Sequence, residues 1–368
     1  MQKEHRVALT EQHIEETLKT VIDQTTGKDY VSSKAVENIK IVDNHVSLDI
    51  ALGYPAKTML ESIREQISAA LKSIAGVNTV TVNVFSKIIP HSVQRGVKLI
   101  PGVKNIIAVA SGKGGVGKSA TAVNLALALA AEGANVGILD ADIYGPSQPQ
   151  MLGLTGHPES PDGKTIEPMM AHGIQAMSIG LLIDAETPMV WRGPMVTQAL
   201  QQLLNDTRWH DLDYLVIDLP PGTGDIQLTL AQRVPVTGAV IVTTPQDIAL
   251  LDARKGLKMF EKVGVPILGI VENMSMHICS KCGHTEHIFG AGGGEKMCAD
   301  YNVELLGALP LDIRIREYSD SGRPSIIAEP NGAIADTYRM IARRVAAKIA
   351  NLAKDYSDVF TQIIMEDN

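Results

Sequence analysis

The stretch Gly112-Lys113-Gly114-Gly115-Val116-Gly117-Lys118-Ser119 satisfies the phosphate-binding pattern G-x-x-x-x-G-K-S/T at every fixed position. The apolar run 106–110 before it predicts a strand, and the alanine-rich run 120–131 after it predicts a helix. Glycines let consecutive backbone N–H groups point inward around a phosphate, and the start of a helix adds partial positive charge. We therefore expect a P-loop in which Lys118 contacts the β- and γ-phosphates of a nucleotide and the Ser119 hydroxyl binds Mg²⁺. The alternative is a glycine-rich turn that only packs a strand against a helix.

From Lys104 onward, predicted strands alternate with predicted helices. This alternation is typical of an α/β fold, here a P-loop NTPase with a mostly parallel sheet covered by helices on both faces. The predicted strands are apolar at consecutive positions, as expected for strands that are buried on both sides. They lie at 106–110, 136–140, 214–218, 239–243, 267–271 and 305–309, and the predicted helices lie at 117–132, 195–204, 226–233, 250–263 and 333–352.

The part of the chain before this unit has the pattern of a small α+β domain in the order α-β-β-α-β. Its features are a helix with the apolar face Ile14, Leu18, Val21 and Ile22, a hairpin around Asp43 and Asn44, a helix that Pro55 opens and Gly76 ends, and a strand with Val80, Val82 and Val84. We expect this domain over 1–88, a linker with two Pro and two Gly over 89–103, and the P-loop domain over 104–368.

Composition and charge exclude several classes of protein. The 368 residues include 41 acidic and 33 basic side chains, a net charge of −8, which argues against a dedicated nucleic-acid binder. Three cysteines are too few for a disulfide framework and indicate a reducing compartment. The N-terminus lacks the apolar core of a signal peptide, and no run approaches the roughly 18 apolar residues of a membrane-spanning helix. We expect a cytoplasmic protein that binds neither nucleic acid nor membrane.

Acidic residues follow two of the predicted strands. Strand 136–140 ends in Asp140-Ala141-Asp142, and strand 214–218 ends in Asp218. Ligands bind at the carboxyl ends of strands in open α/β sheets, so these acids are expected beside the P-loop. Asp218 suits the Walker-B role of holding the magnesium shell, Asp142 suits orienting or deprotonating the attacking water, and Asp140 is expected nearer the metal. The alternative for each is a carboxylate that caps the next helix.

Lys113 lies among the loop glycines, where it is either a solvated charge or a second cation directed at phosphate. With this lysine, the loop resembles the deviant Walker A loop of the MinD/ParA/nitrogenase-iron-protein class. The resemblance implies nucleotide-sandwich dimers in which Lys113 reaches the partner's nucleotide, and segments 140–147 and 218–225 resemble the two switches of that class. Asn273 matches the position at which members contact adenine, with a loop-capping amide as the alternative. The expected ATP-binding residues are Gly112, Lys113, Gly114, Gly115, Val116, Gly117, Lys118, Ser119 and Asn273, and the expected catalytic residues are Lys113, Lys118, Asp142 and Asp218.

A second motif, Cys279-Ser280-Lys281-Cys282, places two thiolates on one tight turn, which suits a soft metal ion or one corner of a cluster. A four-iron cluster usually needs four thiolates, and the remaining cysteine, Cys298, fits a buried small hydrophobe better than a ligand. A two-fold dimer would supply two pairs and complete the set across its interface. The alternatives are an in-chain zinc knuckle with His284 and His287, a bridged zinc on four thiolates, and a redox dithiol. Spacing alone favours zinc and iron–sulfur equally.

Segment 272–294 closely resembles the corresponding segment of the Mrp/ApbC family of bacterial iron–sulfur cluster carriers, and the resemblance runs from about 104 to 330. Residues 10–88 more loosely resemble the small domain of iron–sulfur and ring-hydroxylation assembly factors. The family resemblance implies an ATP-hydrolysing homodimer in which Cys279 and Cys282 carry a bridging [4Fe–4S] cluster, received from an upstream scaffold and passed to apoproteins. No cysteine precedes Cys279, so the N-terminal domain is expected to contact partners rather than metal.

Two rival functions stay open at this point. The first is a MinD/ParA-like positioning ATPase, in which Arg343, Arg344 and Lys348 would belong to a membrane-anchor helix instead of a last core helix. The second is a zinc-bridged scaffold with incidental ATPase activity.

Overall fold

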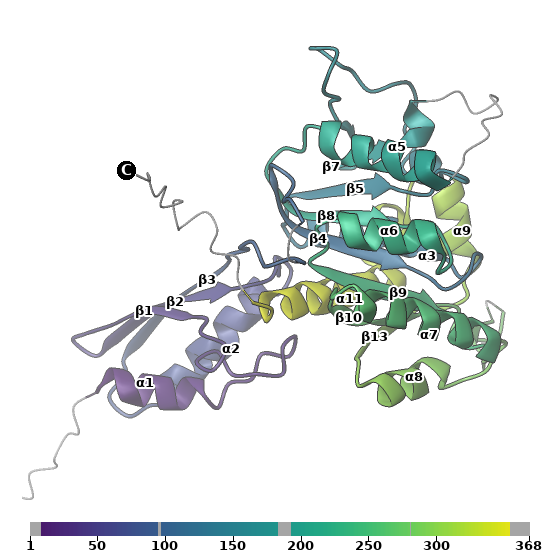
Figure 1. Ribbon diagram of the computed structural model, residues 1–368. Coiled ribbons are helices and arrows are strands. Elements are labelled where there is room, and N and C mark those ends of the chain that lie inside the picture. The colour runs from purple at the N-terminus through teal and green to yellow at the C-terminus, as the bar shows by residue number, and fades with distance from the viewer. Residues whose placement is uncertain (1–8, 95–96, 183–192, 280, 354–368) are drawn as a thin grey trace, which may run out of the picture. The chain divides into compact units, whose positions relative to one another are not determined.

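The structure is a computed structural model that describes residues 9–94, 97–182, 193–279 and 281–353 (Figure 1). The chain divides into two compact units, Met1–Ile88 and Ile89–Asn368. Each unit has its own sheet and its own buried apolar side chains.

The N-terminal unit combines a three-stranded sheet with two helices. Strand β2 lies in the middle, antiparallel to β1 and parallel to β3. Alternate residues of β2, among them Leu48 and Ile50, are buried, as are Ile63 and Ile67 of α2, so one face of the sheet contributes to the core. The order of elements is the predicted α-β-β-α-β: α1 Glu11–Leu18, β1 Val36–Val42, β2 His45–Leu52, α2 Leu60–Lys72 and β3 Thr79–Ser86.

Helix bounds in this unit differ from the predicted ones. α1 ends at Leu18, so Val21 and Ile22 do not belong to its apolar face. The Asp23 carboxylate accepts a backbone N–H and a hydroxyl from the three residues that follow it, and this local turn replaces a further helical turn. α2 begins five residues after the predicted Pro55, because a turn over 57–59 precedes it.

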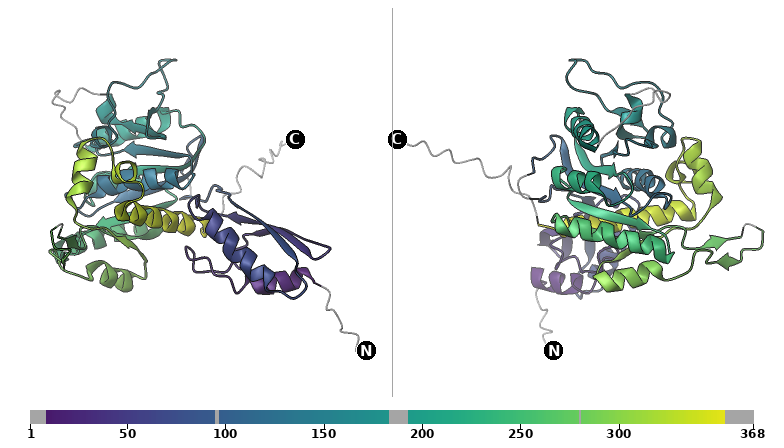
Figure 2. Two further views of the ribbon diagram at one scale, coloured as in Figure 1. Left: turned by 180° about the vertical axis from the view of Figure 1, so that it is seen from behind. Right: turned by 45° about the vertical axis from the view of Figure 1, so that its right-hand side comes forward.

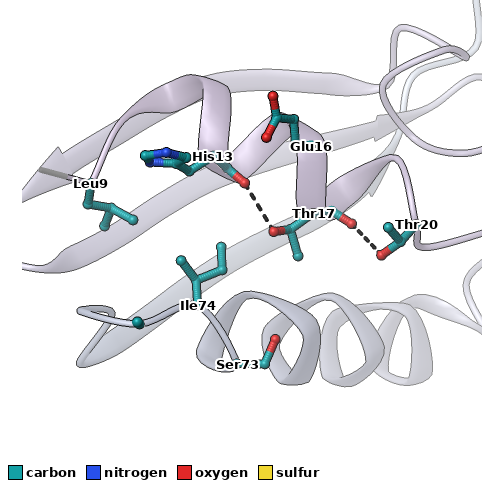
Figure 3. Close-up of a pocket in the computed structure, with 8 residues that line it drawn as sticks. Leu9, His13, Glu16, Thr17, Thr20, Ser73 and Ile74 are labelled. Carbon is teal, nitrogen blue, oxygen red and sulfur yellow. Dashed lines mark hydrogen bonds between the residues drawn. The ribbon is translucent and has the colours of Figure 1, made fainter. Parts of the chain in front are cut away.

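A hollow of about 530 Å³ lies in the N-terminal unit between α1 and the turn after α2 (Figure 3). Two threonine hydroxyls on its wall donate to the backbone of α1, Thr17 Oγ1 to the His13 carbonyl at 3.0 Å and Thr20 Oγ1 to the Thr17 carbonyl at 2.7 Å. The lining is Leu9, His13, Glu16, Thr17, Thr20, Ser73, Ile74 and Ala75. The lining includes no cysteine and no residue of the P-loop.

The C-terminal unit is built on an eight-stranded sheet with the order β13-β10-β9-β4-β8-β5-β7-β6. Neighbouring strands pair parallel, except that β6 and β7 pair antiparallel at one edge. Every residue of β5, β8 and β9 is buried, as the consecutive apolar positions within them predict. The strands are β4 Val103–Ala110, β5 Val136–Asp140, β6 Met169–Ala171, β7 Ile174–Ser178, β8 Leu212–Asp218, β9 Gly238–Thr243, β10 Ile267–Glu272 and β13 Leu305–Ala308.

Helices cover both faces of this sheet, as predicted (Figures 1 and 2). α5 Gly193–Asp206, α6 Asp225–Arg233 and α7 Asp247–Lys262 lie on one face, and α3 Lys118–Ala131 and α11 Ala333–Ala350 pack together on the other. α3 is buried along most of its length, because alanine, leucine and valine face both the sheet and α11. The shorter helices are α4 Gln148–Met151, η1 Ile179–Leu181, α8 Gly293–Tyr301, α9 Ile313–Asp320 and α10 Ser325–Ala328.

Strand β4 lies at a topological switch point of the sheet. The chain passes from β4 through α3 to β5 on one side, and from β8 through α6 to β9 on the other. Ligands bind at such a point, outside the carboxyl ends of the strands, and the P-loop follows β4 there. The edge strands β6 and β7 are additions to the predicted set. They are short and gain their backbone partners from one another and from β5.

None of the helices in the described parts of the chain combines the length and apolar content that a membrane crossing requires.

Candidate nucleotide site and thiol hairpin

The P-loop is the turn between β4 and α3. Gly115 and Gly117 have φ angles of 82° and 81°, in the left-handed region that favours glycine. A Cβ on Gly112 would lie 2.1 Å from the backbone of Asp252 in α7, so no side chain fits there. By contrast, no heavy atom of the described residues lies within 4 Å of the Cβ position of Gly114 or Gly115. The loop therefore has the glycine geometry and the accessible backbone that phosphate binding needs.

Lys118, the first residue of α3, forms a buried ion pair with Asp218, the last residue of β8. The Lys118 side chain is 6% exposed and that of Asp218 is 0% exposed. Lys118 Nζ contacts Asp218 Oδ1 and lies 3.2 Å from Ser119 Oγ. The three residues meet because β4 pairs directly with β8, which brings the loop after one strand to the end of the other.

Asp140 ends β5 beside Asp218, and protein donors occupy both of its carboxylate oxygens. Oδ1 accepts the Asp142 N–H at 3.1 Å, and Oδ2 accepts the Ser147 and Gln148 N–H groups at 2.9 and 3.0 Å. Burial, followed by the neighbouring Asp218 carboxylate, raises the pKa of Asp140. These contacts order the segment after β5, and a position of Asp140 near Mg²⁺ stays a prediction.

Gln148, at the start of α4, is a site residue that the sequence reasoning missed. Its side chain is 1% exposed, and Nε2 donates to Asp218 Oδ2 at 2.9 Å and to the Ser119 carbonyl at 3.1 Å. It thereby ties the segment after β5 to the P-loop and to β8. The signal in the sequence was a polar residue directly after 140–147, and no spacing rule distinguishes such a glutamine from a surface one.

Oxygen donors gather at this point of the structure. They include the Ser119 hydroxyl and the Asp218 carboxylate, together with Asp142, which is partly buried and whose pKa burial raises. Gln148 Oε1 and Ser147 Oγ are buried, and neither has a hydrogen-bond partner among the described residues. Mg²⁺ prefers oxygen ligands and retains bound water, so the donor set fits this ion, which Ser119 and Asp218 would hold.

Lys113 is separate from this buried cluster. It is partly exposed, and its carbonyl accepts the Ser111 hydroxyl at 2.9 Å. Its ammonium forms no hydrogen bond or ion pair with the part of the chain that the structure describes. The reach of Lys113 to a partner's nucleotide stays a prediction.

Asn273, directly after β10, lies beneath the P-loop. It is 7% exposed, and its Nδ2 donates to the Val116 carbonyl at 2.9 Å. A Cβ on Gly117 would lie 2.1 Å from that nitrogen, so the amide packs tightly against the loop. This contact is the loop-capping arrangement that the sequence left open, and contact with adenine stays a prediction.

The two-cysteine turn closes a short hairpin. β11 His277–Ile278 and β12 Thr285–Glu286 pair antiparallel, and the Cys279 N–H donates to the His284 carbonyl at 2.9 Å. Cys279 is partly exposed and Cys282 is exposed. In the right-hand view of Figure 2 the hairpin extends outward from the C-terminal unit. The residue after Cys279 lies outside the described residues.

The three cysteines differ in environment. The N–H groups of Lys281 and Cys282 hydrogen-bond to the Cys279 sulfur and lower the pKa of its thiol. Cys298 is buried in α8, and burial raises the pKa of its thiol to about 11. A low thiol pKa favours the thiolate that binds metal, so the hairpin sulfur is suited to ligation and Cys298 is not.

The histidines near the hairpin make other contacts. His287 Nδ1 hydrogen-bonds with the Ser275 carbonyl at 2.8 Å, and His284 Nε2 lies 3.8 Å from Glu286 Oε1. Within the described residues, no group of three or more His, Cys, Asp or Glu side chains is arranged to hold a metal ion. The in-chain zinc knuckle is therefore not formed there.

Comparison with known proteins identifies a family for each of the two parts of the chain. The family model described as NUBPL iron-transfer P-loop NTPase matches residues 102–346, and the model of an iron–sulfur cluster assembly protein matches residues 11–84. The first match covers more than half of the chain. The chain belongs to the NUBPL iron-transfer P-loop NTPase family. Members of this family are P-loop ATPases, and the loop geometry described above is the part of the structure that carries this activity.

Relatives of this NUBPL-type ATPase include named carriers. The chain is 54% identical over 334 residues to the iron-sulfur cluster carrier protein of Escherichia coli K12. The aligned region covers 90% of each chain. It is 52% identical over 254 residues to the mouse iron-sulfur cluster transfer protein NUBPL, and the aligned region covers 68% of this chain and 80% of the mouse protein. A solved nucleotide-binding protein from Archaeoglobus fulgidus, in complex with ADP, matches with a TM-score of 0.55 and 38% identity over 63% of this chain and 90% of that chain.

Proposed function

We propose that this protein is an ATP-dependent carrier of iron–sulfur clusters, and that two copies hold one [4Fe–4S] cluster on four thiolates. The observation that carries the proposal is the exposed hairpin with Cys279 and Cys282, for which the described residues supply no third ligand. A complete P-loop lies in the same unit. The names of the Escherichia coli and mouse relatives support the same cargo.

The count of thiolates supports the dimer. A four-iron cluster usually takes four thiolate ligands, and one chain offers two in accessible positions. A two-fold axis beside the hairpin would bring Cys279 and Cys282 of both copies to one point. A cluster held at such an exposed interface can be released when the interface changes, which is the property a carrier needs.

On the nucleotide side, this chain's residues divide the work of hydrolysis. Lys118 and the loop backbone bind the β- and γ-phosphates, and Asp142 orients the attacking water. Bound Mg²⁺, held by Ser119 and Asp218, supplies positive charge that stabilises the phosphate oxygens. Lys113 of each copy reaches the nucleotide of the other, so that hydrolysis requires the dimer.

The remaining parts of the chain have proposed places in this scheme. The domain over 1–88 docks the recipient apoproteins or the upstream scaffold, the linker spans 89–103, and the ATPase domain spans 104–368. A cytoplasmic location agrees with the reducing conditions that free thiolates need.

The test is anaerobic reconstitution with iron and sulfide, followed by metal analysis, visible absorption and sedimentation. Wild-type protein is expected to bind four irons per dimer, as the proposed cluster requires. The Cys279→Ser/Cys282→Ser variant is expected to bind none. Cys298→Ser is the matched control, since its sulfur is buried, and it is expected to load normally. A fully loaded monomer would contradict the proposal. Zinc in place of iron and sulfide in protein purified without oxygen would favour the zinc-bridged scaffold.

Contacts of the last helix argue against the positioning ATPase. Arg343 contacts the buried Glu132 carboxylate, Arg344 Nη1 donates to the Leu306 carbonyl at 3.0 Å, and Lys348 Nζ lies 2.6 Å from a Glu304 oxygen. The two arginines are engaged within the unit, which leaves them less available to a lipid surface, whereas Lys348 belongs to a solvent-exposed pair. Sedimentation with anionic vesicles and ATP is expected to leave the protein in the supernatant, and ATP-dependent pelleting would revive this rival.

A further inference from the structure

The carboxyl end of β10 contacts the P-loop. Asn273 Nδ2 donates to the Val116 carbonyl at 2.9 Å, and the Asn273 N–H donates to the Thr243 carbonyl at 2.8 Å. The amide is 7% exposed and leaves no space for a side chain on Gly117. A shift of the loop backbone therefore displaces this amide directly, because closely packed atoms cannot absorb the movement.

The residue before it contacts the other end of the segment that carries the thiols. Glu272 is 6% exposed, and its Oε2 accepts the Gly294 N–H at 2.5 Å. The carboxylate lies at the start of α8, where the helix's partial positive charge stabilises it. A Cβ on Gly294 would lie 2.8 Å from Glu272 Oε2, so this contact is also closely packed. The segment 274–293 thus begins and ends beside two adjacent residues, Glu272 at the end of β10 and Asn273 directly after it.

The base of the hairpin is held in register between these two ends. The Ser275 N–H donates to the Leu309 carbonyl at 2.9 Å, and the Leu311 N–H donates to the Met276 carbonyl at 2.7 Å. His277 Nδ1 hydrogen-bonds with the Leu311 carbonyl at 3.1 Å. These bonds hold the first residues of the hairpin against residues 309–311, so the base moves as one unit if Asn273 displaces it.

We propose that Asn273 and Glu272 are positioning residues that couple nucleotide binding at the P-loop to the geometry with which the thiol hairpin binds its cluster. This inference rests on the proposed carrier function. Phosphate binding moves the Val116 carbonyl, the Asn273 amide follows it, and Glu272 keeps the far end of the segment in place. The hairpin with Cys279 then changes its angle toward the partner's hairpin. Coupling is reciprocal, so a bound cluster must change the affinity for nucleotide by the same factor.

The experiment measures that factor. The dissociation constant of a fluorescent, slowly hydrolysed ATP analogue with Mg²⁺ is determined for anaerobically reconstituted full-length protein and for the cluster-free protein. In wild type, the two constants are expected to differ by about fivefold or more, a typical coupling between two sites. In Asn273→Ala and Glu272→Ala, the ratio of the two constants is expected to fall within about twofold of unity. Each variant removes one of the two side-chain contacts that link the P-loop to the hairpin segment. Loss of an adenine contact alone would weaken both constants equally and leave the ratio unchanged.

Two further variants separate coupling from damage to the fold. Glu272→Gln keeps an oxygen that accepts the Gly294 N–H, so it is expected to restore most of the ratio that Glu272→Ala loses. Ser275→Ala is the matched control, because it removes a buried hydroxyl bond of 3.1 Å to the Leu309 carbonyl in the same segment without touching the loop. It is expected to keep the wild-type ratio.

The outcomes distinguish this inference from the function on which it rests. Iron and sulfide are analysed on the same samples. A loaded wild type with a ratio of one, or wild-type ratios in both alanine variants, would overturn the coupling and leave the carrier function standing. A wild type that retains no cluster would overturn the carrier function, and the coupling with it.

Discussion

The ammonium of Lys118 is paired with the carboxylate of Asp218 in the interior, where 6% and 0% of the two side chains are exposed. The pair joins the first residue of α3 to the last residue of β8, which are 100 positions apart in the chain. If one charge of a buried pair is removed, the other is left uncompensated away from water, which destabilises the fold. The same two residues are expected to bind phosphate and Mg²⁺, so a substitution at either one affects stability as well as catalysis.

Removal of either partner is therefore expected to destabilise the protein. Lys118→Ala and Asp218→Ala should each lower the free energy of unfolding by about 3 kcal/mol, because each leaves an unpaired buried charge. The double variant should lose less than the sum of the two, since no charge is then left unpaired. Urea unfolding without nucleotide measures all four proteins. Strict additivity would contradict a direct interaction.

Lys113 is expected to behave in the opposite way. Its ammonium has no partner among the described residues, so Lys113→Ala should change the free energy of unfolding by less than about 0.5 kcal/mol. ATP hydrolysis should nevertheless fall by about a thousandfold or more, as for other cations supplied to a nucleotide in trans.

Mixing variants tests whether Lys113 acts across the dimer. Lys113→Ala and Asp142→Ala should each be inactive alone. In a mixed dimer, the Lys113→Ala subunit keeps its own Asp142 and receives Lys113 from its partner, so one complete site forms. Steady-state ATPase of the mixture should exceed that of either variant. Absence of any recovery would mean that Lys113 acts within its own subunit.

The hairpin thiol and the buried thiol should differ in their pH dependence. Hydrogen bonds lower the pKa of Cys279, while burial raises the pKa of Cys298 to about 11. Because the thiolate is the nucleophile, alkylation of Cys279 in cluster-free protein should reach its plateau below the pH that an ordinary cysteine requires. Cys298 should stay largely unmodified through the mildly alkaline range. Peptide mapping by mass spectrometry after brief iodoacetamide treatment, in a Cys282→Ser background, reads both rates. Equal rates for the two thiols would refute this prediction.

Loading of the cluster should protect the hairpin alone. Cys279 in reconstituted wild type is expected to become unreactive, because its sulfur is then a ligand, whereas the slow rate of Cys298 should not change. Chelation of the iron should restore the reactivity of Cys279.

A substitution at Gln148 tests whether the buried site accepts a further carboxylate beside Asp218. Gln148→Glu would place a second carboxylate against that of Asp218 in a buried position, so its pKa in the folded state should rise above the unfolded value of about 4.3. A raised carboxyl pKa means that the folded state binds more protons than the unfolded state. Stability should therefore fall as the pH rises from the unfolded pKa toward neutrality.

The matched control is Gln148→Leu, which removes the hydrogen bonds without adding a titratable group. It should lower the free energy of unfolding by about 1 to 3 kcal/mol, because it leaves polar groups unpaired, and its effect should be similar at mildly acidic and neutral pH. Urea unfolding of both variants and wild type at the two pH values makes the comparison. Parallel curves for the two variants would exclude close contact between the side chain of residue 148 and the Asp218 carboxylate.

Local patterns were enough to predict much of this fold. Residues 112–119 indicate a strand, a loop and a helix, because the phosphate-binding backbone needs its glycines at fixed neighbouring positions. The consecutive apolar residues 136–139 of β5 and 214–217 of β8 likewise predict strands buried on both faces, since polar residues do not alternate with them. Local patterns fail where hydrogen bonds from a side chain end a helix, as after α1. They also fail where short strands form only by pairing at the edge of the sheet, as for β6 and β7.

By itself, the sequence determined the fold class, the P-loop and the two-cysteine turn, all of which depend on residues close together in the chain. Only the tertiary structure decided which distant residues meet. Gln148 reaches Asp218, and Asn273 reaches Val116, because the strand order of the sheet brings their loops to one edge. No spacing in the sequence encodes that order, since it results from packing helices on both faces of a single sheet.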